Sequence, residues 1–343
     1  MNRILAHYPD AVARVEWVPL GNAGGFSGSA LWRGQLRGEP LFALKAWPLD
    51  FPAVRLEAIH RWMIQARSNG KCPFVPAVVP STSGRSAVEH ADRVWDITSW
   101  LPGVADFAVD PSEAKLIASC EALAKLHRAW APRQERLAPC PGVERRLALL
   151  RGFDPNVPIL KFVDPQLAEL LSAALPTLRR HVPLAIAALE PWRTQPGPVQ
   201  PCLCDVWHDH VLFTGDRVTG IIDYGSMKLD HPAVVLARWL GVAIGEDRER
   251  LERGLRAYRQ AGGPWNPDAE FVSRLDRTGA VCAAIHWIRR LSATSAPFDG
   301  DRVLERVRKV AARLNAIRLQ TPTFAARIET PTLFLPRPAR GEP

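Results

Sequence analysis

The chain has 343 residues, of which 47% are hydrophobic and 23% charged, and this composition excludes a wholly disordered or fibrous protein. Its 44 Lys and Arg residues outnumber its 35 Asp and Glu residues, so the formal net charge is +9, but no block of five or six basic residues occurs. No apolar run has the roughly 20 residues that a membrane-spanning helix needs. We therefore expect a cytoplasmic protein with two compact units or one two-lobed fold, and no specific nucleic-acid or membrane partner.

The first hundred residues have the pattern of strands joined by turns. Strands are predicted at 12–20, 30–33, 41–47, 75–79 and 93–99. Gly34 and Gly38-Glu39-Pro40 are typical of turns between them, and residues 55–67 carry apolar side chains at helical spacing. This part of the chain is predicted to be a small antiparallel sheet that carries one helix.

The rest of the chain is mostly helical in pattern. Helices are predicted at 112–130, 167–189, 233–244, 247–261, 271–291 and 301–319. Residues 201–224 interrupt them with strand-like runs, and residues 321–343, with five prolines, are predicted to be a tail. The fold class is therefore α+β.

A glycine-containing loop lies between the first two predicted strands. It consists of Gly24, Gly25, Phe26, Ser27 and Gly28. Glycines let backbone N–H groups approach a polyphosphate because no Cβ blocks the approach. The loop matches neither G-x-G-x-x-G nor the P-loop pattern, so an ordinary hairpin turn is the alternative.

Lys45 lies inside the apolar strand 42–47 and needs a partner for its charge unless its head reaches water. Glu57 on the following helix is the natural partner, and the pair would orient Lys45 toward nucleotide phosphates. Residues 95–103 then end a strand in Pro-Gly, where the strand-rich and helical parts meet. A hinge there can stack an adenine, which makes Thr98 and Trp100 candidate nucleotide contacts; an ordinary linker is the alternative.

The most specific pattern lies between residues 203 and 225. Asp205 precedes a short strand at 211–213, and a second strand at 218–222 ends at Asp223. Such a hairpin can bring Asp205, His210 and Asp223 toward one point. One carboxylate can then accept a proton from an attacking hydroxyl while the other groups hold Mg²⁺ against phosphates.

This spacing resembles that of the aminoglycoside phosphotransferase and choline kinase-like family, whose pattern is H-G-D-x-x-x-x-N, a hairpin and then I-D-[WYF]. The resemblance covers about residues 20–320. It implies a bilobal protein-kinase-like fold with an N-lobe at 1–99, a hinge at 100–103 and a larger, mainly helical C-lobe at 104–320.

The resemblance also implies residue roles and a reaction. Asp205 would be the catalytic base, Asp223 the metal-binding aspartate, Lys45 the phosphate contact and Glu57 its ion-pair partner. The implied activity is transfer of the γ-phosphate of ATP or GTP to a hydroxyl of a small molecule with the help of Mg²⁺.

The chain departs from the family pattern at three positions. Leu203 and Cys204 replace His-Gly, and His210 replaces the metal-binding Asn. An imidazole nitrogen is a softer ligand than an amide oxygen, so His210 would suit Mn²⁺ better than an Asn does. These departures leave a non-catalytic, nucleotide-binding pseudokinase as one alternative.

Two further alternatives remain at this stage. His208, Asp209 and His210, joined by Asp223 and His231, would make a metal-dependent hydrolase site. The net charge allows nucleic-acid binding, although no known binding motif supports it.

The acceptor is not determined by these patterns. The helix at 271–291, with His286 and Arg289-Arg290, is expected to line the acceptor part of the cleft. A net charge of +9 argues mildly against a polycationic aminoglycoside acceptor.

Overall fold

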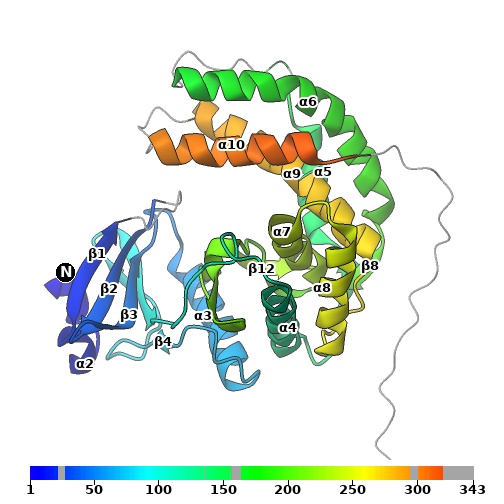
Figure 1. Cartoon of the computed structure of the whole chain (residues 1–343). Helices are drawn as coiled ribbons and strands as arrows, with labels where there is room; N and C mark the ends of the chain where they lie inside the picture. Colours follow the sequence, from blue (N-terminus) through cyan, green and yellow to red (C-terminus); the bar gives the residue numbers. More distant parts are fainter. Residues whose placement is uncertain (22–27, 135, 155, 157–163, 294–299, 320–343) are drawn as a thin grey trace, which may run out of the picture.

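The computed structural model describes residues 1–21, 28–134, 136–154, 156, 164–293 and 300–319. A strand-rich N-lobe passes into a larger helical C-lobe after the strand that ends at Ser99 (Figure 1). The predicted α+β, two-lobed architecture is confirmed. The predicted tail at 321–343 and most of the glycine loop lie outside the described residues.

The N-lobe is an antiparallel sheet with helices on both faces. Its elements are α1 (Asn2–Leu5), α2 (Asp10–Ala13), β1 (Glu16–Gly21), β2 (Ala30–Leu36), β3 (Glu39–Ala46), α3 (Ala53–Ser68), β4 (Val78–Val79), β5 (Val88–His90) and β6 (Arg93–Ser99). The strand order is β1-β2-β3-β6-β4, and β5 also pairs with β6. Leu56 of α3 packs against one face with Trp47, whereas Tyr8 and Val12 pack on the other with Leu44.

The helix predicted at 55–67 and the strands at 41–47 and 93–99 are confirmed, but two N-lobe predictions are wrong. Val12 lies in α2 and not in a strand. Gly34 lies inside β2 and not in a turn; a glycine is found there because a Cβ would lie 2.9 Å from the Trp17 ring that packs on it. The turn between β2 and β3 is at Arg37 and Gly38, which both have positive φ angles.

The C-lobe combines helices with short two-stranded ladders. Its elements are α4 (Glu113–Trp130), β7 (Leu137–Pro139), α5 (Pro141–Arg151), α6 (Pro165–Leu189), η1 (Glu190–Trp192), β8 (Pro196–Pro198), β9 (Gln200–Leu203), η2 (His208–His210), β10 (Val211–Thr214), β11 (Arg217–Ile221), η3 (Tyr224–Ser226), β12 (Met227–Asp230), α7 (Pro232–Ile244), α8 (Arg248–Gln260), α9 (Ala269–Ala293) and α10 (Gly300–Ala316). Each predicted helix is present within a few residues, and α5 is an additional helix. Ser112 caps α4 as expected, because its hydroxyl accepts a hydrogen bond from the N–H of Lys115 at 3.1 Å.

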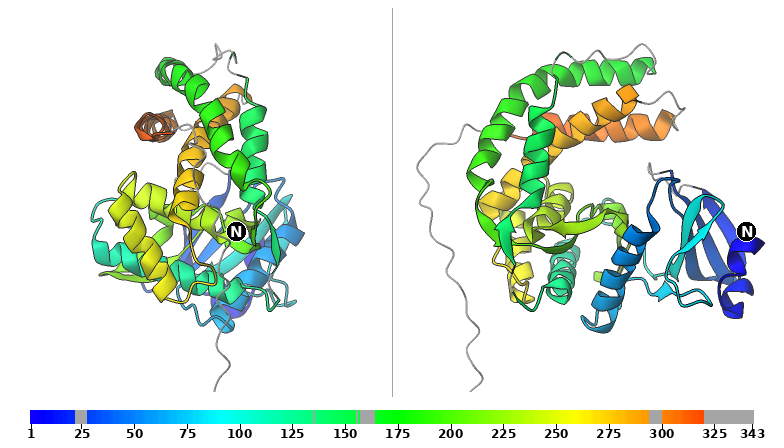
Figure 2. Two further views of the ribbon diagram at one scale, coloured as in Figure 1. Left: turned by 90° about the vertical axis from the view of Figure 1, so that its right-hand side faces the viewer. Right: turned by 180° about the vertical axis from the view of Figure 1, so that it is seen from behind.

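Helices α6, α9 and α10 pack on one another and form an arm that extends from the C-lobe toward the N-lobe (Figures 1 and 2). The long α6 is curved, and Pro176 and Pro183 lie inside it. Among the described helices, none combines the length and apolarity of a membrane-spanning segment.

A fully buried carboxylate, Asp230, joins β12 to the N-terminus of α5. It accepts hydrogen bonds from the backbone N–H groups of Gly142 at 2.8 Å and His231 at 2.9 Å, and it pairs with Arg145. Removing it leaves these donors without an acceptor inside the protein, which is strongly destabilising.

We expect Asp230→Ala to lower the free energy of unfolding by about 2–5 kcal/mol in chemical denaturation, because two buried N–H groups lose their acceptor. The exposed Glu89→Ala is the control and should change it by less than about 0.5 kcal/mol. Equal stability of the two variants would show that the Asp230 network contributes little.

Candidate active site

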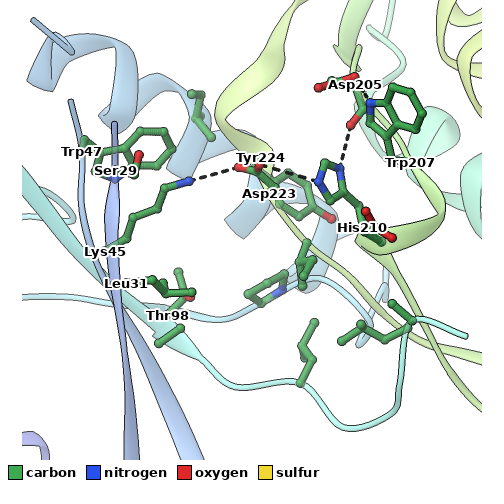
Figure 3. Close-up of a pocket in the computed structure, with 18 of the residues that line it drawn as sticks. Ser29, Leu31, Lys45, Trp47, Thr98, Asp205, Trp207, His210, Asp223 and Tyr224 are labelled. Atoms are coloured by element: carbon green, nitrogen blue, oxygen red, sulfur yellow. Dashed lines mark hydrogen bonds and ion pairs between the residues drawn. The ribbon is translucent and has the colours of Figure 1, made fainter. Parts of the chain in front are cut away.

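A cleft of about 1150 Å³ lies between the lobes and is lined by most of those predicted site residues that the structure describes. The N-lobe contributes Ser29, Lys45, Thr98 and the start of the hinge, and the C-lobe contributes Asp205, His210 and Asp223 (Figure 3). Its volume suits a nucleotide together with a small second molecule.

The glycine loop is described only at its end. Gly24, Gly25, Phe26 and Ser27 lie outside the described residues. Gly28 has a φ of +79°, which favours glycine, and its neighbour Ser29 lines the cleft. Contact of the loop with a nucleotide therefore stays a prediction.

Lys45 points into the cleft, but its partner is not the predicted one. Its Nζ lies 3.0 Å from Oδ1 of Asp223 and 4.0 Å from the centroid of the Trp47 ring. Glu57 pairs instead with Arg85 at 3.1 Å. The prediction of a Lys45–Glu57 ion pair is wrong for this structure, because the carboxylate of Glu57 is engaged by Arg85 from outside the cleft.

The hinge is anchored to the C-lobe hairpin. Thr98 and Trp100 both line the cleft. On the N-lobe side, the N–H of Trp100 donates to the carbonyl of Leu41 in β3 at 2.8 Å. Gly103 has a φ of +104°, and a Cβ there would lie 2.7 Å from the carbonyl oxygen of Phe213. Glycine is needed at this position because the hinge backbone passes so close to the hairpin.

Two antiparallel ladders bring the predicted catalytic and metal-binding loops together. The predicted hairpin is present as β10 and β11, and β9 pairs with β12. The N–H of Asp205 donates to Oγ of Ser226 at 3.0 Å, which ties the loop after β9 to the segment after Asp223. Asp223 itself has a φ of +61°, a left-handed conformation that Asp tolerates better than most residues and that is often found at functional sites.

His210 is oriented with one ring nitrogen toward Asp223. Its Nδ1 lies 2.9 Å from the backbone carbonyl of Asp205, which can only accept, so Nδ1 carries the proton. In a neutral ring Nε2 is then an acceptor, and it lies 3.8 Å from Oδ2 of Asp223 (Figure 3). A metal-binding histidine is typically held by such a bond from its other nitrogen.

The spacing of these two atoms can be compared with that of two ligands of one cation. Two ligands that each lie about 2.1 Å from a cation are about 3.0 Å apart at a right angle and about 4.2 Å apart when opposite. Nε2 and Oδ2 are 3.8 Å apart, between these two values, so the side chains would have to shift by a few tenths of an ångström to share an octahedral cation. Burial raises the pKa of Asp223, but the adjacent Lys45 ammonium, which also donates a hydrogen bond to it, contributes to a net lowering of the pKa, so the carboxylate is ionised at neutral pH.

Asp205 is held firmly at one oxygen. Its Oδ1 accepts from Nε1 of Trp207 at 2.7 Å and from Nε and Nη2 of Arg238 at 3.0 and 2.9 Å. Among the described residues these donors all converge on Oδ1, so Oδ2 is the oxygen left for a substrate hydroxyl. The arrangement orients the predicted base without blocking it.

This order of features, from the cleft lysine through the hinge to the paired aspartate loops, has a counterpart in a known family. A sequence model of the phosphotransferase enzyme family matches residues 20–272. The chain belongs to this family. It is a small-molecule kinase with the protein-kinase-like fold.

Individual relatives agree with the family. A curated homoserine kinase from Ralstonia nicotianae is 29% identical over 269 residues, which is 72% of this chain and 75% of the relative. A second homoserine kinase, from Cupriavidus taiwanensis, is 26% identical over 244 residues, or 66% of each chain.

Solved structures show the same fold. Spectinomycin phosphotransferase in complex with ADP and spectinomycin aligns over 92% of this chain and 96% of its own, with a TM-score of 0.67 and 13% identity. An aminoglycoside phosphotransferase from Alicyclobacillus acidocaldarius aligns over 92% and 93%, with a TM-score of 0.59 and 17% identity.

The arm of this phosphotransferase makes the far end of the cleft basic. His286, Arg289 and Arg290 of α9 line it, as expected, and Arg306 of α10 joins them. Burial, together with the charge of Arg289, lowers the pKa of His286, so this ring is neutral at neutral pH and the arginines supply the positive charge.

Several cleft residues of the kinase were not predicted from the sequence. Trp207 and Arg238 hold Asp205 in place through their hydrogen bonds to its Oδ1. The guanidinium carbons of Arg238 and Arg306 lie 3.7 and 4.1 Å from the centroid of the Trp207 ring. Asp96, which is opposite Lys45 in the sheet, and His60 also line the cleft. The sequence signal for Asp96 was a carboxylate inside a predicted strand, which needs partners if it is buried, but nothing local identified those partners.

The structure does not support the metal-dependent hydrolase alternative, because His231 lies away from the other proposed ligands. His231 is buried away from the cleft, where its Nδ1 accepts from the N–H of Ala233 and its ring packs on Trp265. His208 pairs with the adjacent Asp209. Within the described ranges, no group of three or more His, Cys, Asp or Glu side chains is arranged to hold a metal ion, whereas a catalytic zinc site usually supplies three.

The hydrogen bonds that hold Asp205 lead to a testable prediction for this phosphotransferase. Burial lowers the pKa of Arg238, and the Asp205 carboxylate opposes that shift by stabilising the charged guanidinium. We expect Arg238→Met, which removes the hydrogen bonds but keeps a long side chain, to lower kcat by about 10- to 100-fold through misorientation of the base. Steady-state kinetics measure this change.

Trp207→Phe is the graded comparison, because it removes the Nε1 hydrogen bond but keeps an aromatic ring beside Arg238. It should lower kcat less than Arg238→Met does, and an unchanged kcat in both variants would contradict the proposed orientation of Asp205 by these two residues.

Proposed function

We propose that this kinase transfers the γ-phosphate of ATP, or of GTP, to a hydroxyl of a small acceptor that carries a carboxylate. The charge at the acceptor end of the cleft carries this proposal. Four arginines line that end against two aspartates; they are Arg238, Arg289, Arg290 and Arg306, with Asp205 and Asp209. Arg238 already pairs with Asp205 and Arg289 donates to the carbonyl of Gly152, so the positive charge is in excess but partly engaged. Arginine binds carboxylates through paired hydrogen bonds, whereas a polycation would be repelled.

The curated relatives support the same acceptor class. Both are named homoserine kinases, and homoserine is a small hydroxy amino acid with a carboxylate. It is the first candidate acceptor for this chain.

The proposed reaction forms a bond from the acceptor oxygen to the γ-phosphorus as the bond to the β–γ bridging oxygen breaks and ADP leaves. Oδ2 of Asp205 accepts the hydroxyl proton while Trp207 and Arg238 hold Oδ1. Lys45, with three donors, exchanges its contact with Asp223 for the nucleotide phosphates. Most of the rate enhancement then comes from positioning and charge stabilisation.

Asp223 and His210 are the residues that would hold Mg²⁺ or Mn²⁺. Such a cation neutralises charge on the β- and γ-phosphate oxygens when bound. Two protein ligands are enough, because Mg²⁺ in kinases is completed by phosphate oxygens and water.

The test is an assay of ADP release with matched acceptors. L-Homoserine is compared with homoserinol, in which a CH₂OH group replaces the carboxylate, and with kanamycin as a polycation. We expect turnover with homoserine and a KM at least about tenfold higher for homoserinol. Arg306→Gln should raise the KM for homoserine and leave the KM for ATP unchanged.

Preference for the polycation, or equal use of homoserine and homoserinol, would contradict the acceptor class. Tight nucleotide binding without turnover of any acceptor would instead support the pseudokinase alternative.

A further inference from the structure

A second carboxylate lies next to Lys45 on the floor of the cleft. Asp96 of β6 is the register partner of Lys45 on β3, and residues directly opposite each other in an antiparallel ladder point to the same face. Asp96 is only 5% exposed, yet it lines the cleft together with Lys45. The cleft surface next to Lys45 on the sheet therefore contains a carboxylate.

Two groups hold this carboxylate in place. Nε1 of Trp47 donates to Oδ1 of Asp96 at 2.6 Å, and Nε2 of His60 lies 3.1 Å from Oδ2. The Lys45 ammonium also lies over the Trp47 ring, 4.0 Å from its centroid, so Trp47 contacts both Lys45 and Asp96. Such a network fixes the position of Asp96.

Helix α3 reaches the cleft through His60 and not through Glu57. His60 is 1% exposed and comes one turn after Glu57, whose carboxylate pairs with Arg85. The helix thus contributes the residue that orients the carboxylate, and the strand β6 contributes the carboxylate itself.

Lys45 needs an anchor other than its present one during the reaction. Asp223 is the proposed ligand of the cation, and a carboxylate that binds a cation no longer offers its full charge to a lysine. Asp96 is the carboxylate beside Lys45 on the same sheet face.

We propose that Asp96, oriented by His60 and Trp47, is the positioning residue that holds Lys45 toward the nucleotide phosphates, in place of a glutamate on the helix. This inference rests on the proposed nucleotide site but not on the acceptor. Asp96 stabilises the ammonium from below while the phosphates bind it from the cleft.

The test is nucleotide affinity, measured by calorimetry with Mg²⁺ and a non-hydrolysable ATP analogue. Asp96→Asn keeps the shape of the side chain and removes its charge, and we expect it to raise the nucleotide Kd about tenfold. Glu57→Gln, the change at the helix glutamate, should raise it by less than about twofold. The KM for the acceptor should stay unchanged in both.

A double-mutant cycle separates positioning from a general structural effect. If Asp96 acts through Lys45, Asp96→Asn has no further effect on nucleotide affinity in a Lys45→Met background. Additive effects of the two substitutions, or a larger effect of Glu57→Gln than of Asp96→Asn, would overturn the inference.

A second variant covers the case in which Asp96→Asn does not fold. His60→Gln keeps a donor near Asp96 but loosens its orientation, and we expect it to weaken nucleotide binding about threefold at unchanged thermal stability. Unchanged affinity in folded His60→Gln contradicts the role given to His60. A wild-type protein that does not bind the nucleotide refutes the proposed function, and the inference fails with it.

Discussion

Replacing Asp205 by Asn will lower kcat by about three orders of magnitude and leave nucleotide affinity nearly unchanged. The amide keeps the size of the side chain and still offers one oxygen to Trp207 and Arg238. It cannot accept the hydroxyl proton, so only the chemical step is affected. Steady-state kinetics with the best acceptor, together with calorimetry of nucleotide binding, measure the two effects separately.

Asp216→Asn is the matched control for this prediction. Asp216 lies in the turn between β10 and β11 and pairs with the hydroxyl of Ser112, outside the cleft. Its substitution should leave kcat within about twofold. An active Asp205→Asn enzyme would remove Asp205 from the mechanism.

Asp223→Asn has the second large expected effect. The change removes the charge that pairs with Lys45 at 3.0 Å and the oxygen that faces Nε2 of His210. We expect kcat/KM to fall by at least about a thousandfold and the tightening of nucleotide binding by Mg²⁺ to disappear. Titration of nucleotide affinity against Mg²⁺ and Mn²⁺ in both proteins gives the result.

His210→Asn is the comparison for Asp223→Asn, because it replaces the imidazole by the hard oxygen that Mg²⁺ prefers. It should keep turnover with Mg²⁺ and reduce any preference for Mn²⁺. Mg²⁺ dependence that persists in Asp223→Asn would show that the cation binds elsewhere.

Local patterns were enough to predict most elements of the fold. The β10–β11 hairpin follows from two apolar runs around Gly215-Asp216, and the helices follow from apolar periodicity. α5 was missed although Val143, Leu147 and Leu150 form a buried stripe, because the stripe is short and Arg145 and Arg146 interrupt it.

Partnerships across the fold were not predictable in the same way. The spacing between Lys45 and Glu57 suggests an ion pair, but which turn of α3 faces the lysine depends on how the helix sits on the sheet. Arg85 engages Glu57 there, and the cleft is left to His60 and Asp96. The sequence contains these residues without any local signal that connects them.

The acceptor end depends on tertiary structure even more strongly. Arg238 lies on α7, which packs against the segment after Trp207, and Arg306 lies on α10 of the arm; only the tertiary structure brings both to the Trp207 ring. Periodicity predicts each helix but not the face that it presents to the cleft. The basic lining was therefore expected only in part, from the helix at 271–291.

A crystal structure with Mg²⁺, a non-hydrolysable ATP analogue and a carboxylated acceptor tests the central claim most directly. We predict the γ-phosphate between Asp205 and Asp223, a cation within about 2.3 Å of the Asp223 carboxylate and of Nε2 of His210, and the acceptor hydroxyl on Oδ2 of Asp205. A nucleotide bound outside the cleft, or a γ-phosphate out of reach of both aspartates, would contradict it.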